Sequence, residues 1–168
     1  MAKLSASQQS LSFLSSHDSL TGLYNRLFFE TEFKRLNSSR LFPISIIMAD
    51  VDGLKIVNNK FGHSPGDQVL KNIAALFSNV FRQEGIVSRF GGDEFVILLP
   101  NTNSIIAKKV MIRMRMQIDE YNHSHPDLPI NISMGISTAN LGESLSGHLK
   151  NANTLMYQEK QERKRKVF

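Results

Sequence analysis

The stretch IVSRFGGDEFVILL, residues 86–99, predicts a β-hairpin. Residues 86–90 and 94–99 are two short apolar runs, and the glycine pair before Asp93 suits the tight turn between them. Pro100 ends the second strand, because proline has no N–H group to donate to a ladder. The other predicted strands lie on either side of this hairpin in the sequence.

Two further segments read as strands. Residues 42–51, FPISIIMADV, form a short Ile-rich run opened by Pro43, which is typical of a buried strand. Residues 130–137 alternate apolar with small polar residues, which is typical of a half-buried strand. Helical spacing of apolar residues and flanking turn residues predict helices over 26–37, 54–61, about 65–85, 104–122 and 145–160.

From the first strand onward the predicted order is β-α-α-β-β-α-β-α. Without one of the two helices before the hairpin, this is the βαββαβ order of a ferredoxin-like sheet. The sequence therefore predicts a single α+β domain, with its sheet packed against helices, over residues 17–168. Residues 1–16 are predicted as a separate N-terminal helix with a partial heptad of leucines at 4, 11 and 14; the alternative is a ragged chain end.

Composition excludes several classes of protein. The 168 residues contain no cysteine, which excludes a disulfide scaffold and a thiolate metal site. The net charge is +5, but residues 163–166 alone carry four positive charges, which argues against a broad nucleic-acid-binding face. No run approaches the ~20 apolar residues of a membrane span, and the N-terminus lacks the apolar core of a signal peptide. We expect a cytoplasmic chain without membrane insertion, or the cytosolic part of a longer protein.

Two acidic clusters stand at comparable places. Asp50 and Asp52 end the first strand, and Asp93 and Glu94 occupy the hairpin turn. In a βαββαβ sheet the first strand lies beside a hairpin strand, so the clusters should meet at one edge. Converging carboxylates repel each other and favour a divalent cation, and their oxygen ligands suit Mg²⁺ or Mn²⁺ and phosphoryl transfer. The alternative is that each aspartate is only a turn residue beside a glycine.

Lys55 lies in the first turn of a predicted helix, where a positive charge opposes the helix dipole. A phosphate there would be held by Lys55 and by the N–H groups of Asp52, Gly53 and Leu54. The alternative is a solvated lysine on a helix surface.

Asn58 and Asp67 suit recognition of guanine. A carboxylate accepts from the N1–H and N2–H₂ groups of guanine, an amide bonds O6 or N7, and adenine lacks the paired donors. Asp67, which follows Pro65-Gly66, would equally serve as an N-cap. Gly91 and Gly92 allow the backbone to approach a ligand closely, or simply make a tight turn.

Taken together, these segments resemble one family. Residues 89–95, RFGGDEF, match the RxGGDEF motif of the GGDEF-domain diguanylate cyclases. Residues 50–67 are similar to that family's DxDxFKxxND…GHxxGD block, and residues 18–26, DSLTGLYNR, resemble its D-x-LTGLxNR opening. Residues 133–135 resemble its S-x-G strand. The four blocks follow in the family's order between residues 18 and 164.

The resemblance implies condensation of two GTP into cyclic di-GMP and two pyrophosphates, by two-metal-type phosphoryl transfer on a palm-like βαββαβ core. Matching positions imply that Asp50, the carbonyl of Val51 and Asp93 hold Mg²⁺, with Mn²⁺ as the alternative ion. Asp93 would also help to deprotonate the 3′-hydroxyl, with Lys55 and Glu94 in the catalytic set.

The same matching positions imply how substrate is bound. Asn58 and Asp67 would bind guanine, Lys55 would stabilise the phosphates, and Lys160 and Lys164 would contact them. One domain that holds one GTP has no second 3′-hydroxyl to present, so catalysis implies a two-fold homodimer. The helix of residues 3–16 would then be the lower end of a stalk below an upstream sensor.

Departures from the family pattern leave alternatives open. The RxxD product site reads Arg82-Gln83-Glu84-Gly85 and lacks its aspartate, which predicts weak or absent product inhibition. The late G-R-N segment is Arg163-Lys164-Arg165, and a lysine loses the bidentate fork of arginine, which weakens the predicted phosphate contact. The chain is therefore either an active cyclase or a degenerate module that binds GTP or cyclic di-GMP and regulates a partner or a fused domain. A palm enzyme that uses ATP is a third reading.

Overall fold

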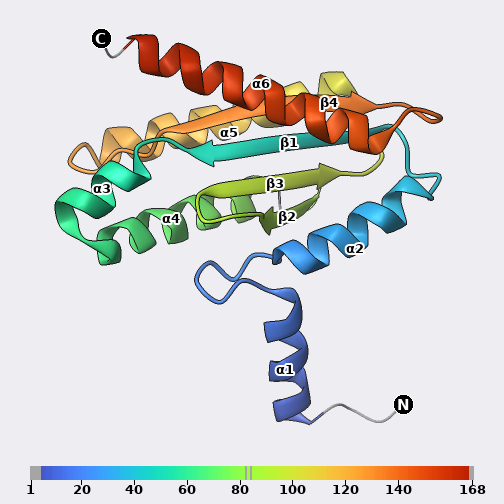
Figure 1. Ribbon diagram of the computed structural model, residues 1–168, viewed down its shortest axis with the longest axis horizontal. Helices are drawn as coiled ribbons and strands as arrows, with labels where there is room; N and C mark the ends of the chain where they lie inside the picture. Colours follow the sequence, from blue (N-terminus) through green and yellow to red (C-terminus); the bar gives the residue numbers. More distant parts are fainter. Residues whose placement is uncertain (1–4, 82, 84, 167–168) are drawn as a thin grey trace.

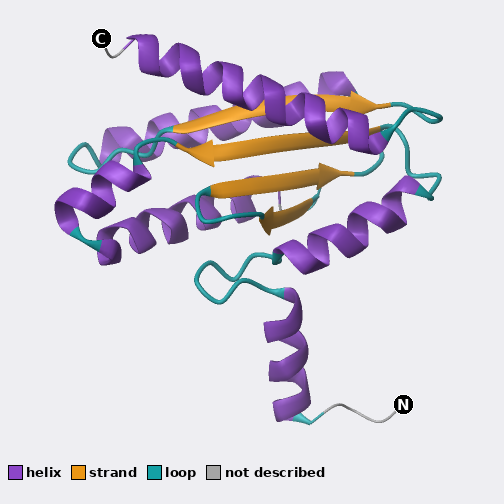
Figure 2. Ribbon diagram, viewed as in Figure 1, coloured by secondary structure: helices purple, strands orange, loops and turns teal. Residues whose placement is uncertain are grey.

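A four-stranded antiparallel sheet forms the centre of the molecule (Figures 1 and 2). The computed structural model describes residues 5–81, 83 and 85–166. The strand order is β2-β3-β1-β4, which is that of a ferredoxin-like sheet, so the predicted fold class is confirmed. The strands are β1 (Ile44–Val51), β2 (Ile86–Arg89), β3 (Glu94–Leu99) and β4 (Ile132–Ala139).

Helices cover both faces of the sheet. On one face α3, α4 and α5 share a core with the strands, and on the other face α2 and α6 share a second core (Figure 1). The helices are α1 (Ala6–Ser16), α2 (Arg26–Asn37), α3 (Leu54–Phe61), α4 (His63–Phe81), α5 (Ser104–Ser124) and α6 (Leu145–Lys166).

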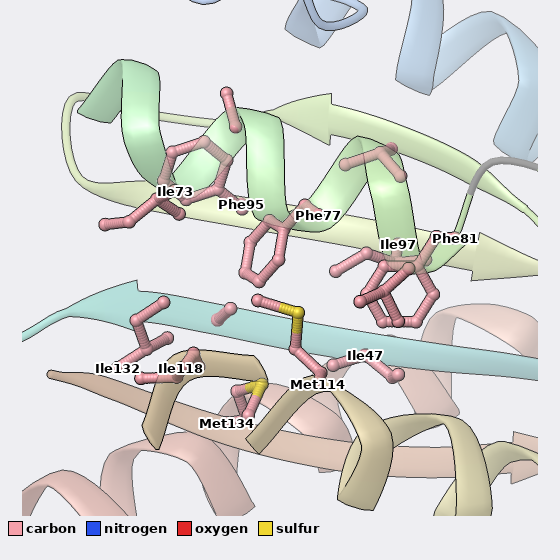
Figure 3. Packing of buried hydrophobic residues seen from close by; sticks show 14 of the residues in the cluster. Ile47, Ile73, Phe77, Phe81, Phe95, Ile97, Met114, Ile118, Ile132 and Met134 are labelled. Atoms are coloured by element: carbon pink, nitrogen blue, oxygen red, sulfur yellow. The ribbon is translucent and has the colours of Figure 1, made fainter. Parts of the chain in front are cut away.

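Strand β1 is buried along its whole length because it contributes to both cores. Ile47 belongs to the first core, which contains Phe77, Phe95 and Met114 (Figure 3). Ile46, the next residue back, belongs to the second core. Side chains alternate between the two faces of a strand, so a strand covered on both sides needs apolar residues at nearly every position. This requirement explains the uninterrupted apolar run in the sequence.

Most element bounds agree with those predicted, and α4 and α6 differ. Helix α4 begins at His63, so Pro65 lies in its first turn, where proline is tolerated. Asp67 is therefore inside the helix, and its reading as an N-cap is wrong. Helix α6 continues past residue 160 through the basic run to Lys166.

Helix α1 projects away from the sheet (Figure 1), and none of its residues is buried. Its apolar side chains at positions 11, 13 and 14 are exposed. The body holds the end of this helix through Asn25, whose N–H donates to the carbonyl of Ser16 at 2.9 Å and whose Nδ2 donates to that of Ser15 at 3.0 Å. Of the helices in the described ranges, none has the length and apolar character needed to cross a bilayer.

Candidate active site

The two acidic clusters meet where β1 ends. Asp50 lies directly opposite Glu94 in the register of β1 and β3. The N–H group of Val51 donates to the carbonyl of Asp93 at 2.9 Å, which fixes the turn of residues 91–93, here called the glycine bend, against the end of β1. The strand order therefore brings these acidic residues to one edge of the sheet, as predicted.

Asp50 is the most buried of these carboxylates, with 8% of the residue exposed. Its Oδ2 accepts from Lys160 Nζ at 2.9 Å, and its Oδ1 is buried without a hydrogen-bond partner among the described residues. Burial raises the pKa of Asp50, and the nearby charges of Asp93 and Glu94 raise it further, while the Lys160 bond opposes the shift. The raised pKa means that the single Lys160 contact does not fully compensate the ionised Asp50 carboxylate for its burial and for its acidic neighbours.

The oxygen ligands at the end of β1 suit a magnesium ion whose remaining ligands come from the substrate. In the described part of the chain, no group of three or more acidic or histidine side chains gathers as a self-sufficient metal site. Mg²⁺ usually binds through one or two carboxylates plus substrate phosphates. Asp50 and Asp93, with the Val51 carbonyl, provide two carboxylates and a carbonyl, and the unpartnered Oδ1 of Asp50 is an available ligand. These residues therefore fit Mg²⁺.

Hydrogen bonds to residues in and next to β4 fix the turn that follows β1. Ser133 Oγ donates to both carboxylate oxygens of Asp52, at 3.0 and 2.8 Å, and the Asp52 N–H donates to the carbonyl of Asn131 at 2.7 Å. The prediction that this N–H is free for a phosphate is therefore wrong, because the β1–β4 pairing continues past the end of the strand. Gly53 adopts φ +76°, and the N–H groups of Gly53 and Leu54 stand at the start of α3, where helical N–H groups lack backbone partners.

A cleft of about 300 Å³, here called the polar cleft, lies beside the glycine bend. Asn58 Oδ1 is buried against Gly66 and has no hydrogen-bond partner among the described residues. Asp67, on α4, is exposed in the same cleft. The cleft thus brings together six predicted site residues from three segments of the chain: Leu54, Lys55, Asn58, Asp67, Gly92 and Asp93. Its lining comprises Leu54, Lys55, Asn58, Asp67, Leu70, Arg89, Gly92 and Asp93.

A second cleft of about 520 Å³, here called the basic cleft, lies along α6 on the other side of the turn. Burial lowers the pKa of Lys160, but its bond to Asp50 and the neighbouring carboxylates outweigh this and the pKa is raised, so Lys160 stays charged. Asn131 and Arg163 also line this cleft; Asn131 is not among the predicted site residues, and Arg163 is noted in the sequence only as part of the altered G-R-N segment. The lining residues are Asp52, Gly53, Ile56, Asn131, Lys160, Arg163, Lys164 and Lys166.

Glu94 does not line the polar cleft. It lines a separate groove with Met48, Phe90 and Leu149, and its Oε2 lies against Gly91, 3.2 Å from where a Cβ would be. Gly91 does not line the polar cleft either, whereas Gly92 does. A catalytic role for Glu94 and a binding role for Gly91 stay predictions.

The segment that corresponds to the RxxD product site is described only in part, since Arg82 and Glu84 lie outside the described residues. Gly85 stands where the motif carries aspartate, and a Cβ there would lie 2.6 Å from the backbone oxygen of Leu98 and from a methyl group of Leu99. The backbone is thus too close to β3 for a side chain at this position. Weak product inhibition stays a prediction.

Arg89 connects the glycine bend to the DSLTGLYNR turn. Its Nη1 donates to both carboxylate oxygens of Asp18 at 3.2 Å, and its Nη2 donates to the carbonyl of Gly92 at 2.8 Å. Thr21 donates to Asp18 from its N–H at 2.9 Å and from Oγ1 at 2.7 Å. Burial raises the pKa of Asp18, but these hydrogen bonds and the Arg89 charge outweigh it, and the pKa is lowered.

Replacing Asp18 by Asn should lower the free energy of unfolding at neutral pH by about 2 kcal/mol, because hydrogen bonds to a charged group are lost. The folded pKa lies below 3.8, so the stabilisation is complete above that pH and is lost as pH falls through the lowered value. Urea unfolding of both proteins from pH 7 to pH 3 measures this. Asp127→Asn, in an exposed loop, is the control, and a difference that grows on acidification contradicts the ion pair.

Comparison with known proteins agrees with this architecture. The chain is 33% identical over 151 residues to the response regulator PleD of Caulobacter vibrioides (strain NA1000 / CB15N), which covers 85% of this chain and 33% of PleD. It is 30% identical over 176 residues to diguanylate cyclase A of Treponema denticola, which covers 99% of this chain and 47% of that protein. The chain thus spans less than half the length of these relatives.

Solved structures share the fold. The diguanylate cyclase SiaD of Pseudomonas aeruginosa, in complex with its activator SiaC, superposes with TM-score 0.79 at 29% identity, covering 92% of this chain and 62% of that chain. The coiled coil and GGDEF domain of DgcB from Caulobacter crescentus, in complex with c-di-GMP, gives TM-score 0.81 at 23% identity, covering 92% and 85%. The family model "Diguanylate cyclase, GGDEF domain" matches residues 15–166, and the chain therefore belongs to the GGDEF domain family.

Proposed function

We propose that this GGDEF domain is an active diguanylate cyclase. In each of two equivalent steps, the 3′-oxygen of one GTP forms a bond to the α-phosphorus of the other, the bond to the β-phosphate oxygen breaks, and pyrophosphate leaves. The products are one cyclic di-GMP and two pyrophosphates, and the two hydroxyl protons pass to bases. The observation that carries the proposal is the buried, unpartnered Oδ1 of Asp50 beside a cleft that holds Asp93, Asn58 and Asp67.

The chain's own residues would divide the work as follows. Asn58 and Asp67 bind guanine, and Asp93 accepts the proton of the attacking hydroxyl. Bound Mg²⁺, held by Asp50, the Val51 carbonyl and Asp93, would neutralise phosphate charge and lower the pKa of that hydroxyl. The phosphates would lie across the start of α3, where they contact the N–H groups there and Lys55, Lys160 and Lys164.

One polar cleft would bind one GTP, so the reaction needs two copies of the domain that face each other. Each copy would then present its 3′-hydroxyl to the α-phosphate held by the other. Helix α1, with its exposed Leu11, Phe13 and Leu14, is the segment through which an upstream sensor would control this pairing. The proposal thus places the domain within a longer signalling protein.

A second candidate function is a module that binds nucleotide without turnover. It is favoured by the contact between Lys160 Nζ and Asp50 Oδ2, which occupies one oxygen of the metal-binding carboxylate. The lysine must release this oxygen, or share it, before a metal ion uses both. An active enzyme makes this exchange when GTP offers its phosphates to Lys160, whereas a degenerate module keeps the ion pair.

Incubation of the purified chain with GTP and Mg²⁺ separates these functions. An active cyclase forms cyclic di-GMP and pyrophosphate in a ratio of one to two and forms no product from ATP. Equilibrium dialysis with GTP runs beside the assay. Binding without product supports the regulatory module, and turnover of ATP supports a different palm enzyme. If the chain shows no binding and no turnover, both proposals are contradicted.

Gly66→Ala should weaken GTP binding about tenfold, because a Cβ at this buried position would overlap Asn58 Oδ1 and push the amide out of place. The overlapped atom ends a flexible side chain, so the fold should keep its stability. Isothermal titration with GTP measures the affinity. Gly147→Ala, another helical glycine whose Cβ would lie 3.5 Å from Ser144, should bind like the parent; equal affinity of the two variants contradicts the role of Asn58.

A further inference from the structure

The solvent face of α5 carries apolar side chains where a surface helix is ordinarily polar. Ile105, Ile112 and Met116 are 64%, 57% and 64% exposed. At 100° per residue these three positions fall within about 40° of one another. They lie opposite the buried side of the helix, which consists of Ala107, Val110, Met114 and Ile118. Together they form a narrow apolar stripe along the middle of the exposed side.

Charges flank this stripe in a fixed order. Lys108 and Lys109 stand in the first half of the helix, and Asp119 and Glu120 stand in the second half. In the described part of the chain, these four residues form no ion pair within 4.0 Å, although Glu120 Oε2 accepts from Gln117 at 3.5 Å. One end of the stripe is thus positive and the other end negative, with their charges available to a partner.

The order is self-complementary for an antiparallel second copy. When two α5 helices cross level with residue 114, Ile112 of each copy faces Met116 of the other. The same register places Lys109 against Glu120 on one side of the stripe and Lys108 against Asp119 on the other. The two-fold axis places each flank of the stripe beside the same flank of the partner, so the lysine–carboxylate pairs form on both flanks. A parallel copy would instead place lysine against lysine.

Two arginines near the crossing point are held clear of the stripe. Arg115 Nη2 lies 2.8 Å from Glu159 Oε1 on α6, and Arg113 Nη2 donates to the carbonyl of Val80 on α4 at 2.8 Å. These contacts direct the guanidinium groups toward the neighbouring helices on either side. The surface between them is left to the apolar side chains.

We propose that the outer face of α5 binds the same face of a second copy of this chain in an antiparallel, two-fold arrangement. The stripe contains none of the residues that line the polar or the basic cleft. The inference does not depend on cyclase activity, and it describes a contact separate from the one that would bring two clefts together.

Cysteine cross-linking tests the direction of the pair, since the chain has no cysteine of its own. Position 105 faces position 123 of the partner in the antiparallel register, and a parallel pair brings position 105 to its own equivalent. The two positions are 18 residues apart, about 27 Å along a helix. Ile105→Cys mixed with His123→Cys should form a disulfide under mild oxidation, and Ile105→Cys alone should not. The reverse pattern overturns the proposal.

Sedimentation equilibrium of charge variants tests complementarity. Lys109→Glu and Glu120→Lys should each raise the dimer dissociation constant about tenfold, since symmetry repeats each substitution, and the double variant should restore it. Ile112→Asp should weaken the dimer about tenfold or more, while Leu141→Asp, at a position 74% exposed in the loop between β4 and α6, should not. Circular dichroism checks that every variant stays folded. A monomeric parent chain, or variants that leave the dissociation constant unchanged, overturns the proposal.

Discussion

Replacing Asp93 by Asn should lower the rate of cyclic di-GMP formation at least about a hundredfold, the range expected when a general base is lost. The amide keeps the size of the side chain, and the backbone carbonyl that accepts from Val51 is unchanged. The asparagine amide cannot accept the proton of the attacking hydroxyl, and it has no negative charge to bind a metal ion. The fold should therefore survive while turnover fails.

Pyrophosphate release under saturating GTP and Mg²⁺ gives the rate, and equilibrium dialysis with GTP in EDTA tests the guanine contacts separately. Asp127→Asn, in the exposed loop between α5 and β4, should keep the parent rate. A rate above about a tenth of the parent would limit the contribution of Asp93 to about 1.4 kcal/mol of transition-state stabilisation. That result would contradict its assignment as ligand and base, even if GTP still binds.

The sheet could be predicted because its signals are local. The hairpin of residues 86–99 is marked by a glycine pair between two apolar runs, and β1 by an apolar run that both cores require. Once these strands and the helices between them are assigned, the βαββαβ order leaves one common sheet arrangement. That arrangement then predicts that Asp50 and the glycine bend meet at one edge.

Helix ends were harder to predict where turn residues lie inside a helix. Pro65 and Gly66 are predicted to open α4, but the helix begins two residues earlier, at His63, directly after Gly62 with φ +84°. The end of α6 has no apolar periodicity to reveal it, since residues 161–166 are charged or polar and pack little. Helix propensity and continuity from the buried first half extend it instead.

The polar contacts of the site could not be predicted, because their partners lie far apart in the sequence. Lys160 reaches Asp50 across 110 residues, and Ser133 reaches Asp52 across 81. No local pattern encodes such pairs, so motif letters gave candidate residues but not their contacts. The ion pair at Asp50 is the clearest case, since it bears directly on how a metal ion would bind.

Gly135→Ala should reduce the free energy of unfolding by about 3 kcal/mol, the upper range for overpacking a core. A Cβ at this position would overlap the carbonyl oxygen of Ala152 and the N–H nitrogen of Met156, and it would lie 3.0 Å from the carbonyl carbon of Leu155. These are backbone atoms of α6, which do not move aside as a flexible side chain does. The helix must therefore shift away from β4 as a body.

That shift would also reach the site, because α6 carries Lys160, whose Nζ contacts Asp50 at 2.9 Å, and Lys164 of the basic cleft. We therefore expect Gly135→Ala to lose affinity for GTP phosphates as well as stability. Urea unfolding and GTP titration measure the two losses. Gly147→Ala, on α6 itself, meets only Ser144 at 3.5 Å and should be neutral or stabilising by up to about 1 kcal/mol. If both variants unfold alike, α6 does not press on β4 at Gly135, and the position of Lys160 must be fixed elsewhere.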